Sequence, residues 1–188
     1  MRHLTRGVDE RGLRAAASAA SVTAMEDGLV IRDATPADGQ AIVAIGRELV
    51  EDGDAYVFGP ATSDDELKAY WLSPAGRTVV AVLGGEVAGC YYLRSNYPGR
   101  GRHVANVSYA VARRFMRRGI GRAMAEHSIE AARRAGFQAM QFNLVISTNE
   151  AAVTLWRTLG FRIVGTLPRV FDHAERGLVD AYVMHKFL

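Results

Sequence analysis

The apolar positions of this chain change period along its length, and these changes predict alternating strands and helices. Apolar runs typical of strands lie at 29–32, 78–83, 86–93, 104–111, 139–145, 162–167 and 179–186. Stretches with a helical period lie between them, at 35–50, 63–72, 121–135 and 149–159. The predicted order, β-α-α-β-β-β-α-β-α-β-β, indicates an α/β fold in which four helices flank a mixed sheet.

Residues at the predicted ends support these boundaries. Pro36 opens the first helix, where its missing N–H costs no hydrogen bond. Ser63 and Glu66 have the spacing of a capping box. Gly84-Gly85 suits a two-residue hairpin turn. Each signal marks a point at which one period gives way to another.

Length and composition fit one globular domain. The 188 residues are 49% hydrophobic and 23% charged, which excludes collagen, coiled coils and wholesale disorder. We expect a single domain over 26–188 and a loose N-terminal extension over 1–25, with a short helix over 11–20 as the alternative. No uncharged apolar run reaches the ~20 residues of a membrane helix, so no membrane partner is expected.

The single cysteine, Cys90, lies in a predicted strand and is expected to be a core residue. It can form no internal disulfide and cannot hold a zinc ion alone. We therefore predict no metal site and a reducing, cytoplasmic location.

The net charge of +3 combines two opposite blocks. Residues 26–66 hold eleven acids and two bases, whereas residues 100–134 hold nine arginines and two glutamates. A basic block implies a nearby anion. Nucleic acid is one candidate, but the chain lacks a basic face interleaved with aromatic residues, so no nucleic-acid partner is predicted.

The basic block surrounds a strand, a glycine turn and a helix start. Gly119 and Gly121 have no Cβ, so a ligand can approach the backbone closely. The first N–H groups of the helix lack internal partners and lie at the positive end of its dipole. Five arginines are close by in sequence: Arg113, Arg114, Arg117, Arg118 and Arg122. The pattern predicts a pyrophosphate site, and a tight turn before a solvated basic helix is the alternative.

Two other glycine-rich phosphate loops are excluded. A Walker loop needs Lys followed by Ser or Thr after its last glycine, where this chain has Arg122-Ala123. A dinucleotide fingerprint needs a third glycine, where this chain has Met124.

These residues resemble the GCN5-related N-acetyltransferases, the GNAT family. Arg118-Gly119-Ile120-Gly121 matches the end of the family's phosphate motif, Gln/Arg-x-x-Gly-x-Gly/Ala, although Met116 stands at its first position. The segment 149–161 is similar to the helix that flanks the pantetheine arm. The resemblance covers 29–188. It implies a mostly antiparallel sheet splayed between its fourth and fifth strands, with acetyl-CoA in the gap and no metal.

The resemblance also implies roles for residues. The backbone N–H of Val111, at the end of the fourth strand, would polarise the thioester carbonyl. The family often uses a tyrosine to stabilise the leaving thiolate. Trp156 stands at that position here, so Tyr109 or a water is the candidate donor. The cofactor would be held by Val111, Arg117, Arg118, Gly119, Ile120, Gly121, Arg122, Asn149, Ala152 and Trp156. An N-cap role for Asn149 and core packing for Trp156 are the alternatives.

Segments 103–111 and 142–149 are also similar to fungal enzymes that acetylate proline analogues such as azetidine-2-carboxylate. This similarity implies that Asn106, Asn143 and Leu144 contact the acceptor. Asparagine is disfavoured inside strands, so both asparagines are expected to hydrogen-bond something. A satisfied buried amide is the alternative.

The predicted function is acetyl-CoA-dependent N-acetylation of a small molecule, an amino acid or analogue, by direct transfer in a ternary complex. The acidic segment 26–66 would then border the acceptor and draw a cationic amine. Candidate bases are His103, Glu150, Glu51, Asp52 and Asp54. A protein N-terminal or lysine acetyltransferase and a non-catalytic acyl-CoA-binding regulatory domain are the alternatives. The family also implies a homodimer through the last strands.

Overall fold

The computed structural model describes residues 23–24 and 28–188. Its described helices are α2 (Gly39–Asp52), α3 (Asp64–Trp71), α4 (Ile120–Arg134) and α5 (Glu150–Thr158), with 3₁₀ turns η1 (Pro36–Asp38), η2 (Gly99–Gly101) and η3 (Arg113–Phe115). Its described strands are β1 (Thr23–Ala24), β2 (Leu29–Asp33), β3 (Arg77–Leu83), β4 (Glu86–Ser95), β5 (Val104–Val111), β6 (Ala139–Ile146), β7 (Arg162–His173) and β8 (Gly177–Phe187). The predicted α/β order is confirmed.

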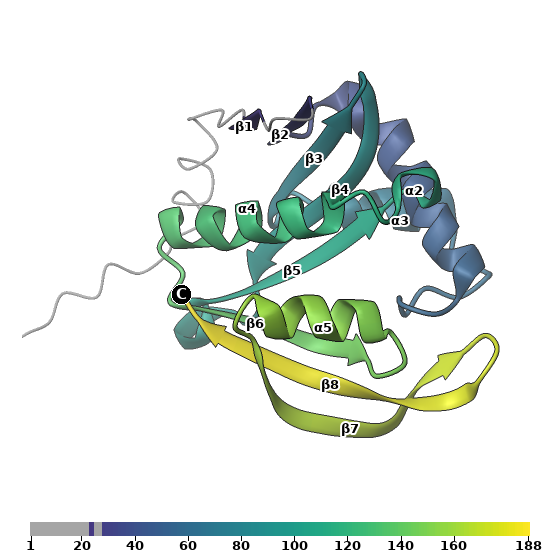
Figure 1. Ribbon diagram of the computed structural model, residues 1–188, viewed down its shortest axis with the longest axis vertical. Coiled ribbons are helices and arrows are strands. Elements are labelled where there is room, and N and C mark those ends of the chain that lie inside the picture. The colour runs from purple at the N-terminus through teal and green to yellow at the C-terminus, as the bar shows by residue number, and fades with distance from the viewer. Residues whose placement is uncertain (1–22, 25–27) are drawn as a thin grey trace, which may run out of the picture.

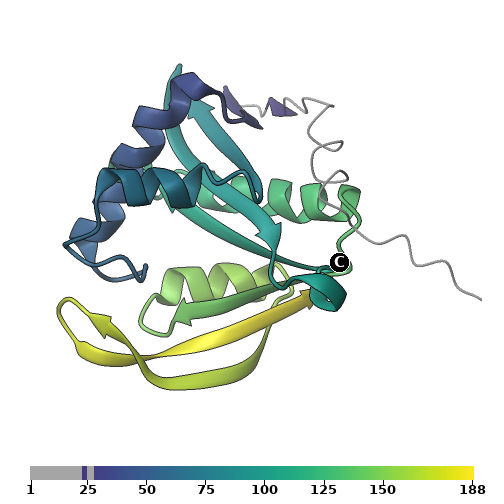
Figure 2. The same ribbon diagram turned by 180° about the vertical axis from the view of Figure 1, so that it is seen from behind.

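Within these residues the strands form one sheet in the order β1-β2-β3-β4-β5-β6-β8-β7 (Figure 1). Neighbouring strands are antiparallel except β5 and β6, which are parallel. Helices α4 and α5 lie on one face of the sheet, and α2 and α3 lie on the other (Figures 1 and 2). The mostly antiparallel mixed sheet is therefore confirmed.

The sheet opens between β5 and β6, as the resemblance implied. The two strands pair only at the start of β5, through Val104 and Ala105. Just beyond, Asn106 spans the widening gap, because its Nδ2 donates to the Gln141 carbonyl at 2.9 Å. Each strand keeps its ladder on the other side, β5 with β4 and β6 with β8. The backbone of β5 therefore faces an open gap along its second half.

The central strand β4 is buried on both faces and reads as a nearly continuous apolar run. Cys90 is fully buried there, and burial raises the pKa of its thiol to about 12. The prediction that Cys90 is a core residue is confirmed.

The last two strands are longer than predicted. A register shift between Leu167 and Phe171 explains the error, since the bulge interrupts the two-residue period. Arg169 lies in this bulge at φ 51°, and its N–H donates to Asp180 Oδ1 at 2.8 Å. Strand β7 therefore continues to His173, well past its predicted end at 167, whereas β8 exceeds its predicted range only by two residues at its start and one at its end.

The turn between β7 and β8 reaches the end of α2. Ala174 N–H donates to the Gly53 carbonyl at 3.0 Å. A Cβ on Gly53 would lie 2.9 Å from Ala174 Cβ, so glycine is required for this approach. The C-terminal hairpin is thereby tied to the loop that follows α2 (Figure 2).

Strand β1 falls within the segment predicted to be a loose extension and pairs with β2. The sequence pattern did not predict this strand. The alternative helix over 11–20 lies outside the described residues. None of the helices in the described ranges is long and apolar enough to span a membrane.

Candidate active site

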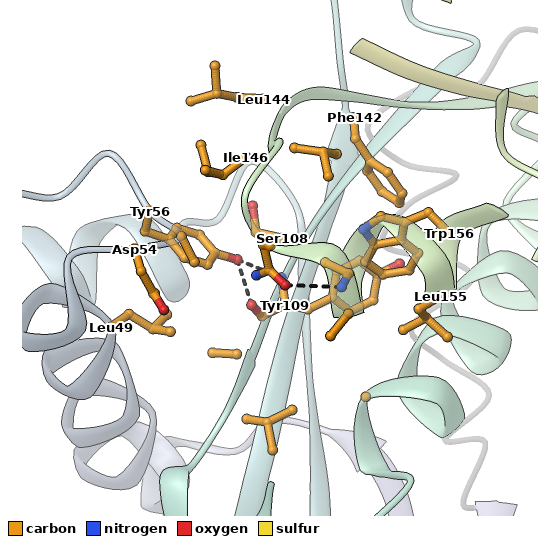
Figure 3. Close-up of a pocket in the computed structure, with 18 of the residues that line it drawn as sticks. Leu49, Asp54, Tyr56, Ser108, Tyr109, Phe142, Leu144, Ile146, Leu155 and Trp156 are labelled. Carbon is orange, nitrogen blue, oxygen red and sulfur yellow. Dashed lines mark hydrogen bonds between the residues drawn. The ribbon is translucent and has the colours of Figure 1, made fainter. Parts of the chain in front are cut away.

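The gap between β5 and β6 is a cleft of about 790 Å³ (Figure 3). Its walls come from β5, β6, α5, the start of α4 and the loop after α2. Eight of the thirteen residues predicted for the cofactor and the acceptor line it: Asn106, Val111, Gly121, Asn143, Leu144, Asn149, Ala152 and Trp156. The other five, Arg117, Arg118, Gly119, Ile120 and Arg122, do not line the cleft. Tyr109 lines it as well. One cleft therefore brings together residues predicted for the cofactor and for the acceptor.

The free edge of β5 presents backbone groups to this cleft. The hydroxyl of Tyr56, from the loop after α2, donates to the Tyr109 carbonyl at 2.6 Å and accepts from the Tyr109 N–H at 2.8 Å (Figure 3). Ala112 N–H instead donates to Ala88 in β4. Because N–H directions alternate along a strand, the N–H of Val111 faces the cleft as that of Tyr109 does. The predicted role of Val111 stays a prediction, and this geometry suits it.

Aromatic rings form the wall on the α5 side. The Trp156 ring centre lies 4.6 Å from that of Phe142 and 5.0 Å from that of Tyr109. Phe142 in turn stacks on Phe161 at 4.5 Å. Trp156 is buried in this cluster, as its core-packing alternative requires, and it also lines the cleft.

The hydroxyl of Tyr109 is engaged with α4. It lies 2.6 Å from Ser128 Oγ of α4, on the face of the sheet that α4 covers. Burial raises the pKa of Tyr109 well above its ordinary value. The phenol is therefore a weak acid, and its predicted service to a leaving thiolate would be hydrogen bonding rather than proton transfer.

The turn before α4 has the geometry of an anion cradle. Arg117 and Gly119 adopt positive φ angles of 60° and 77°, which turn backbone N–H groups into a concave arrangement. A Cβ on Gly119 would have no neighbour within 4 Å, and one on Gly121 would lie 3.9 Å from Val111. The backbone is thus open to a ligand at the positive end of α4, and these groups fit a pyrophosphate.

The group of five arginines around this turn, Arg113, Arg114, Arg117, Arg118 and Arg122, carries less unpaired positive charge than the sequence indicated. Three of its arginines lie in ion pairs: Arg113 with Glu51 and Asp52, Arg114 with Glu86, and Arg122 with Glu126. Arg117 and Arg118 form no ion pair within the part of the chain that the structure describes. They are the arginines available to phosphate charge.

The same pairing reduces the acidic field of 26–66. Arginines hold five of its acids: Asp33 by Arg77, Asp38 by Arg32, Asp64 by Arg47, and Glu51 and Asp52 by Arg113. The Arg32 guanidinium holds the pKa of Asp38 well below its ordinary value. Of the acids in this segment that line the cleft, Asp54 has no ion pair among the described residues. The hypothesis that the whole segment attracts a cationic acceptor stays a prediction, because two of these four arginines, Arg32 and Arg47, belong to the segment and were already counted in its charge.

The two predicted acceptor asparagines differ in their hydrogen bonding. Asn143 is engaged by neighbours: its Oδ1 accepts from Gln141 Nε2 at 2.8 Å, and its Nδ2 donates to Asn96 Oδ1 at 2.7 Å. Asn106 is buried and uses its Nδ2 to bridge the strands, while its Oδ1 is free among the described side chains. Leu144 follows Asn143 in a bulge of β6 and lines the cleft.

Asn149 caps α5. Its side chain accepts from Ala152 N–H at 3.0 Å, which confirms the N-cap alternative. Both residues also line the cleft, so capping places them there.

The residues of the cleft that the sequence analysis missed include Tyr56, Arg94 and His173. Arg94 could have been found from the sequence, because it is a charged residue directly after the apolar run of β4. Tyr56 could not, because it lies in an irregular loop without any periodic pattern. The Nδ1 of His173 accepts from Glu175 N–H at 3.1 Å, so the neutral ring carries its proton on Nε2.

The remaining candidate bases divide clearly. Asp52, Asp54 and Glu150 line the cleft, whereas Glu51 and His103 do not. Within the described ranges, no three His, Cys, Asp or Glu side chains are grouped to hold a metal ion.

Comparison with known proteins identifies the class. Residues 45–161 match the profile of the Acetyltransferase (GNAT) family. The chain belongs to this family, which confirms the predicted family and the predicted class, an acyltransferase.

Similar structures and a curated relative agree with this assignment. A GCN5-related N-acetyltransferase from Kribbella flavida has a TM-score of 0.82 and 43% identity over 85% of this chain and 98% of its own. A putative acetyltransferase from Salmonella typhimurium, solved with acetyl-CoA, has a TM-score of 0.76 and 25% identity over 85% and 94%. N-acetyltransferase aca1 from Schizosaccharomyces pombe is 38% identical over 98 residues, 50% of this chain and 46% of the relative. The match thus spans about half the length of that curated relative.

Proposed function

We propose that this chain transfers the acetyl group of acetyl-CoA to the amine of a small molecule, an amino acid or analogue, by direct transfer in a ternary complex. One observation carries the proposal. A single cleft runs from Gly121, at the start of α4 beside the anion cradle, across the free edge of β5 to the polar acceptor side. The acetyl-CoA present in the Salmonella structure and the activity named for the fungal relative support it.

The residues of the cradle suit the charged end of acetyl-CoA. Backbone N–H groups from Gly119 to Gly121 would bind the pyrophosphate, and Arg117 and Arg118 would add charge. Ala152 and Trp156 would line the pantetheine arm. When bound, acetyl-CoA would supply the activated acetyl group.

The N–H of Val111 would stabilise negative charge on the acyl oxygen during transfer. A fixed backbone donor needs no reorganisation as that charge develops. One such donor contributes roughly 3–4 kcal/mol in other enzymes.

The attacking amine must be neutral, so a group in the cleft must take its proton. Asp54 and Glu150 line the cleft and form no ion pair with described residues, so they are the candidate acceptors, directly or through water. His173 offers a donor there, because its Nδ1 lone pair is already used.

A thiol-release assay with acetyl-CoA tests the function. The panel contains amino acids, proline analogues including azetidine-2-carboxylate, polyamines, aminoglycosides and peptides. Release with a small amine and an acetylated product by mass spectrometry are expected. Release only with peptides would overturn the proposal in favour of a protein acetyltransferase, and binding of coenzyme A without release would indicate a regulatory domain.

A backbone substitution tests the step at Val111. Val111→Pro removes the N–H that faces the cleft and leaves the ladder to β4 intact. We expect kcat to fall roughly 10²–10³-fold. Val111→Ala, which keeps the N–H, is the matched control and should retain most activity.

A further inference from the structure

Arg94 is a cation on the acceptor side of the cleft without an acidic partner. It lies near the end of β4, directly across the ladder from Asn106, and lines the cleft. Its guanidinium lies 5.5 Å from the ring centres of both Tyr70 and Tyr92. Among the described residues it forms no ion pair and no side-chain hydrogen bond. The other arginine that lies in a strand next to it, Arg77, is by contrast neutralised by Asp33.

The two tyrosine rings hold the guanidinium without using its N–H donors. Stacking on aromatic faces orients a guanidinium plane, and the donors at its edge stay available. The planar fork of donors matches a carboxylate, which it binds through two parallel hydrogen bonds. Arg94 is therefore oriented for an anion that the described chain does not supply.

The position of Arg94 also relates it to the reacting edge. The hydroxyl of Tyr70 lies 2.6 Å from Ser108 Oγ, and Ser108 precedes Tyr109, whose backbone Tyr56 contacts. The guanidinium therefore stands on an aromatic floor that leads to the free edge of β5. An anion bound there would lie on the acceptor face, which is opposite the face that carries α4 and its phosphate cradle.

We propose that Arg94 binds the carboxylate of the acceptor, so that the substrate class is amines with a carboxylate close to the amine, such as α-amino acids. The free Oδ1 of Asn106 accepts a hydrogen bond from the same molecule. Anchoring the carboxylate at Arg94 directs the amine toward Tyr109 and Val111. The inference rests on the proposed function, because it names the acceptor of that reaction. A carboxylate site at Arg94 would distinguish amino acids from polyamines and from peptide N-termini, because neither of these has a carboxylate close to the amine.

The test compares each α-amino acid that releases thiol with its primary amide, in the wild type and in Arg94→Gln. The wild type should prefer the acid over the amide at least tenfold in kcat/KM. Arg94→Gln should lower kcat/KM for the acid about 10–100-fold through KM, and should change the amide little, because only the charge-assisted hydrogen bonds are lost. Arg94→Lys keeps the positive charge but lacks the planar fork of donors. Its kcat/KM for the acid should therefore lie between those of the wild type and Arg94→Gln.

Arg100→Gln is the matched control, since Arg100 is exposed in the next loop and does not line the cleft. It should leave the acid-to-amide ratio unchanged. A purely structural role of Arg94 would lower stability without changing that ratio, and an unchanged ratio in Arg94→Gln overturns the proposal.

If no amine releases thiol, the proposed function fails. Calorimetry of N-acetyl amino acids and their amides, with coenzyme A present, then decides the carboxylate site, and equal or absent binding of the acids overturns it.

Discussion

At the scale of single residues, Tyr56 has the most specific contact in the cleft. Burial raises the pKa of its phenol well above the ordinary value, so the hydroxyl stays protonated and both donates and accepts at Tyr109. We expect Tyr56→Phe to leave both backbone groups without a partner. Stability should fall by about 1–2 kcal/mol in urea unfolding, and kcat/KM should fall roughly tenfold. Tyr97→Phe is the control, because Tyr97 is 47% exposed and, among the described residues, its hydroxyl hydrogen-bonds no backbone group and only accepts from Gln141 Nε2 at 2.9 Å. Equal behaviour of the two variants would contradict the role given to Tyr56.

We expect His127 to make the stability of the protein depend on pH. The ring is buried, with its Nδ1 2.8 Å from the Tyr91 hydroxyl and its Nε2 without a partner among the described residues. Burial, followed by the charges of Arg77 and Arg134, lowers its pKa to about 4, although Asp33 acts in the opposite direction.

As the pH falls, the unfolded chain therefore binds the proton first, near pH ~6.5. The contribution of His127 is complete above about pH 6.5 and is lost as the pH falls toward its folded pKa. The free energy of unfolding should drop by up to about 3 kcal/mol over this window. His127→Gln should flatten the dependence in denaturant titrations, and an equally steep profile would refute the assignment.

Sequence reasoning identified residues whose role follows from local geometry. The tight turn at Gly119 and the N-cap alternative for Asn149 could be predicted, because a glycine turn and an N-cap each depend on a few neighbours in the chain. Tyr56 and Arg94 could not be predicted in the same way. Their partners are the Tyr109 backbone and the ring of Tyr70, which only the folded chain brings near.

At the scale of elements, the helices were predicted more accurately than the last strands. Ser63 and Glu66 form the predicted capping box, and α3 begins directly after Ser63. The β7–β8 hairpin was underestimated because its bulge at Arg169 hides the two-residue period. A periodic pattern predicts an element only as far as the element stays regular.

The glycine turn before α4 gives a prediction at this scale. Gly119 and Gly136 lie at opposite ends of the helix, with φ of 77° and 84°, so alanine at either position is strained by about 1–2 kcal/mol. Both Gly119→Ala and Gly136→Ala should therefore lower the free energy of unfolding similarly. Only Gly119→Ala should weaken coenzyme A, by roughly tenfold in calorimetry, because it alone disturbs the cradle. Equal affinities in the two variants would move the phosphate site away from this turn.

At the scale of the whole molecule, the two charge blocks lie against each other. Arg113 from the basic block reaches Glu51 and Asp52 at the end of α2 and donates to the Glu48 carbonyl at 3.1 Å. Counts along the sequence could not show this pairing, because it depends on how η3 packs beside α2. The charge counts along the sequence indicated a broad positive field and a broad negative field. In the folded protein the charges relevant to the cleft are local: Arg117 and Arg118 lie on the cofactor side, and Asp54 and Arg94 lie on the acceptor side.

The outer edge of the sheet leads to the last prediction. Strand β7 is an edge strand whose side chains are exposed on both faces along much of its length. Val164 is 62% exposed, and Val170 and Leu178 are also exposed on this hairpin. Long apolar edges favour pairing with another chain, so we expect a homodimer through β7 and β8.

Light scattering should report a dimer for the wild type and a monomer for a Val164→Glu/Val170→Glu variant. Val57→Glu, at a position 70% exposed but in the loop after α2, should stay dimeric. A monomeric wild type at micromolar concentration would show that this edge is left unpaired.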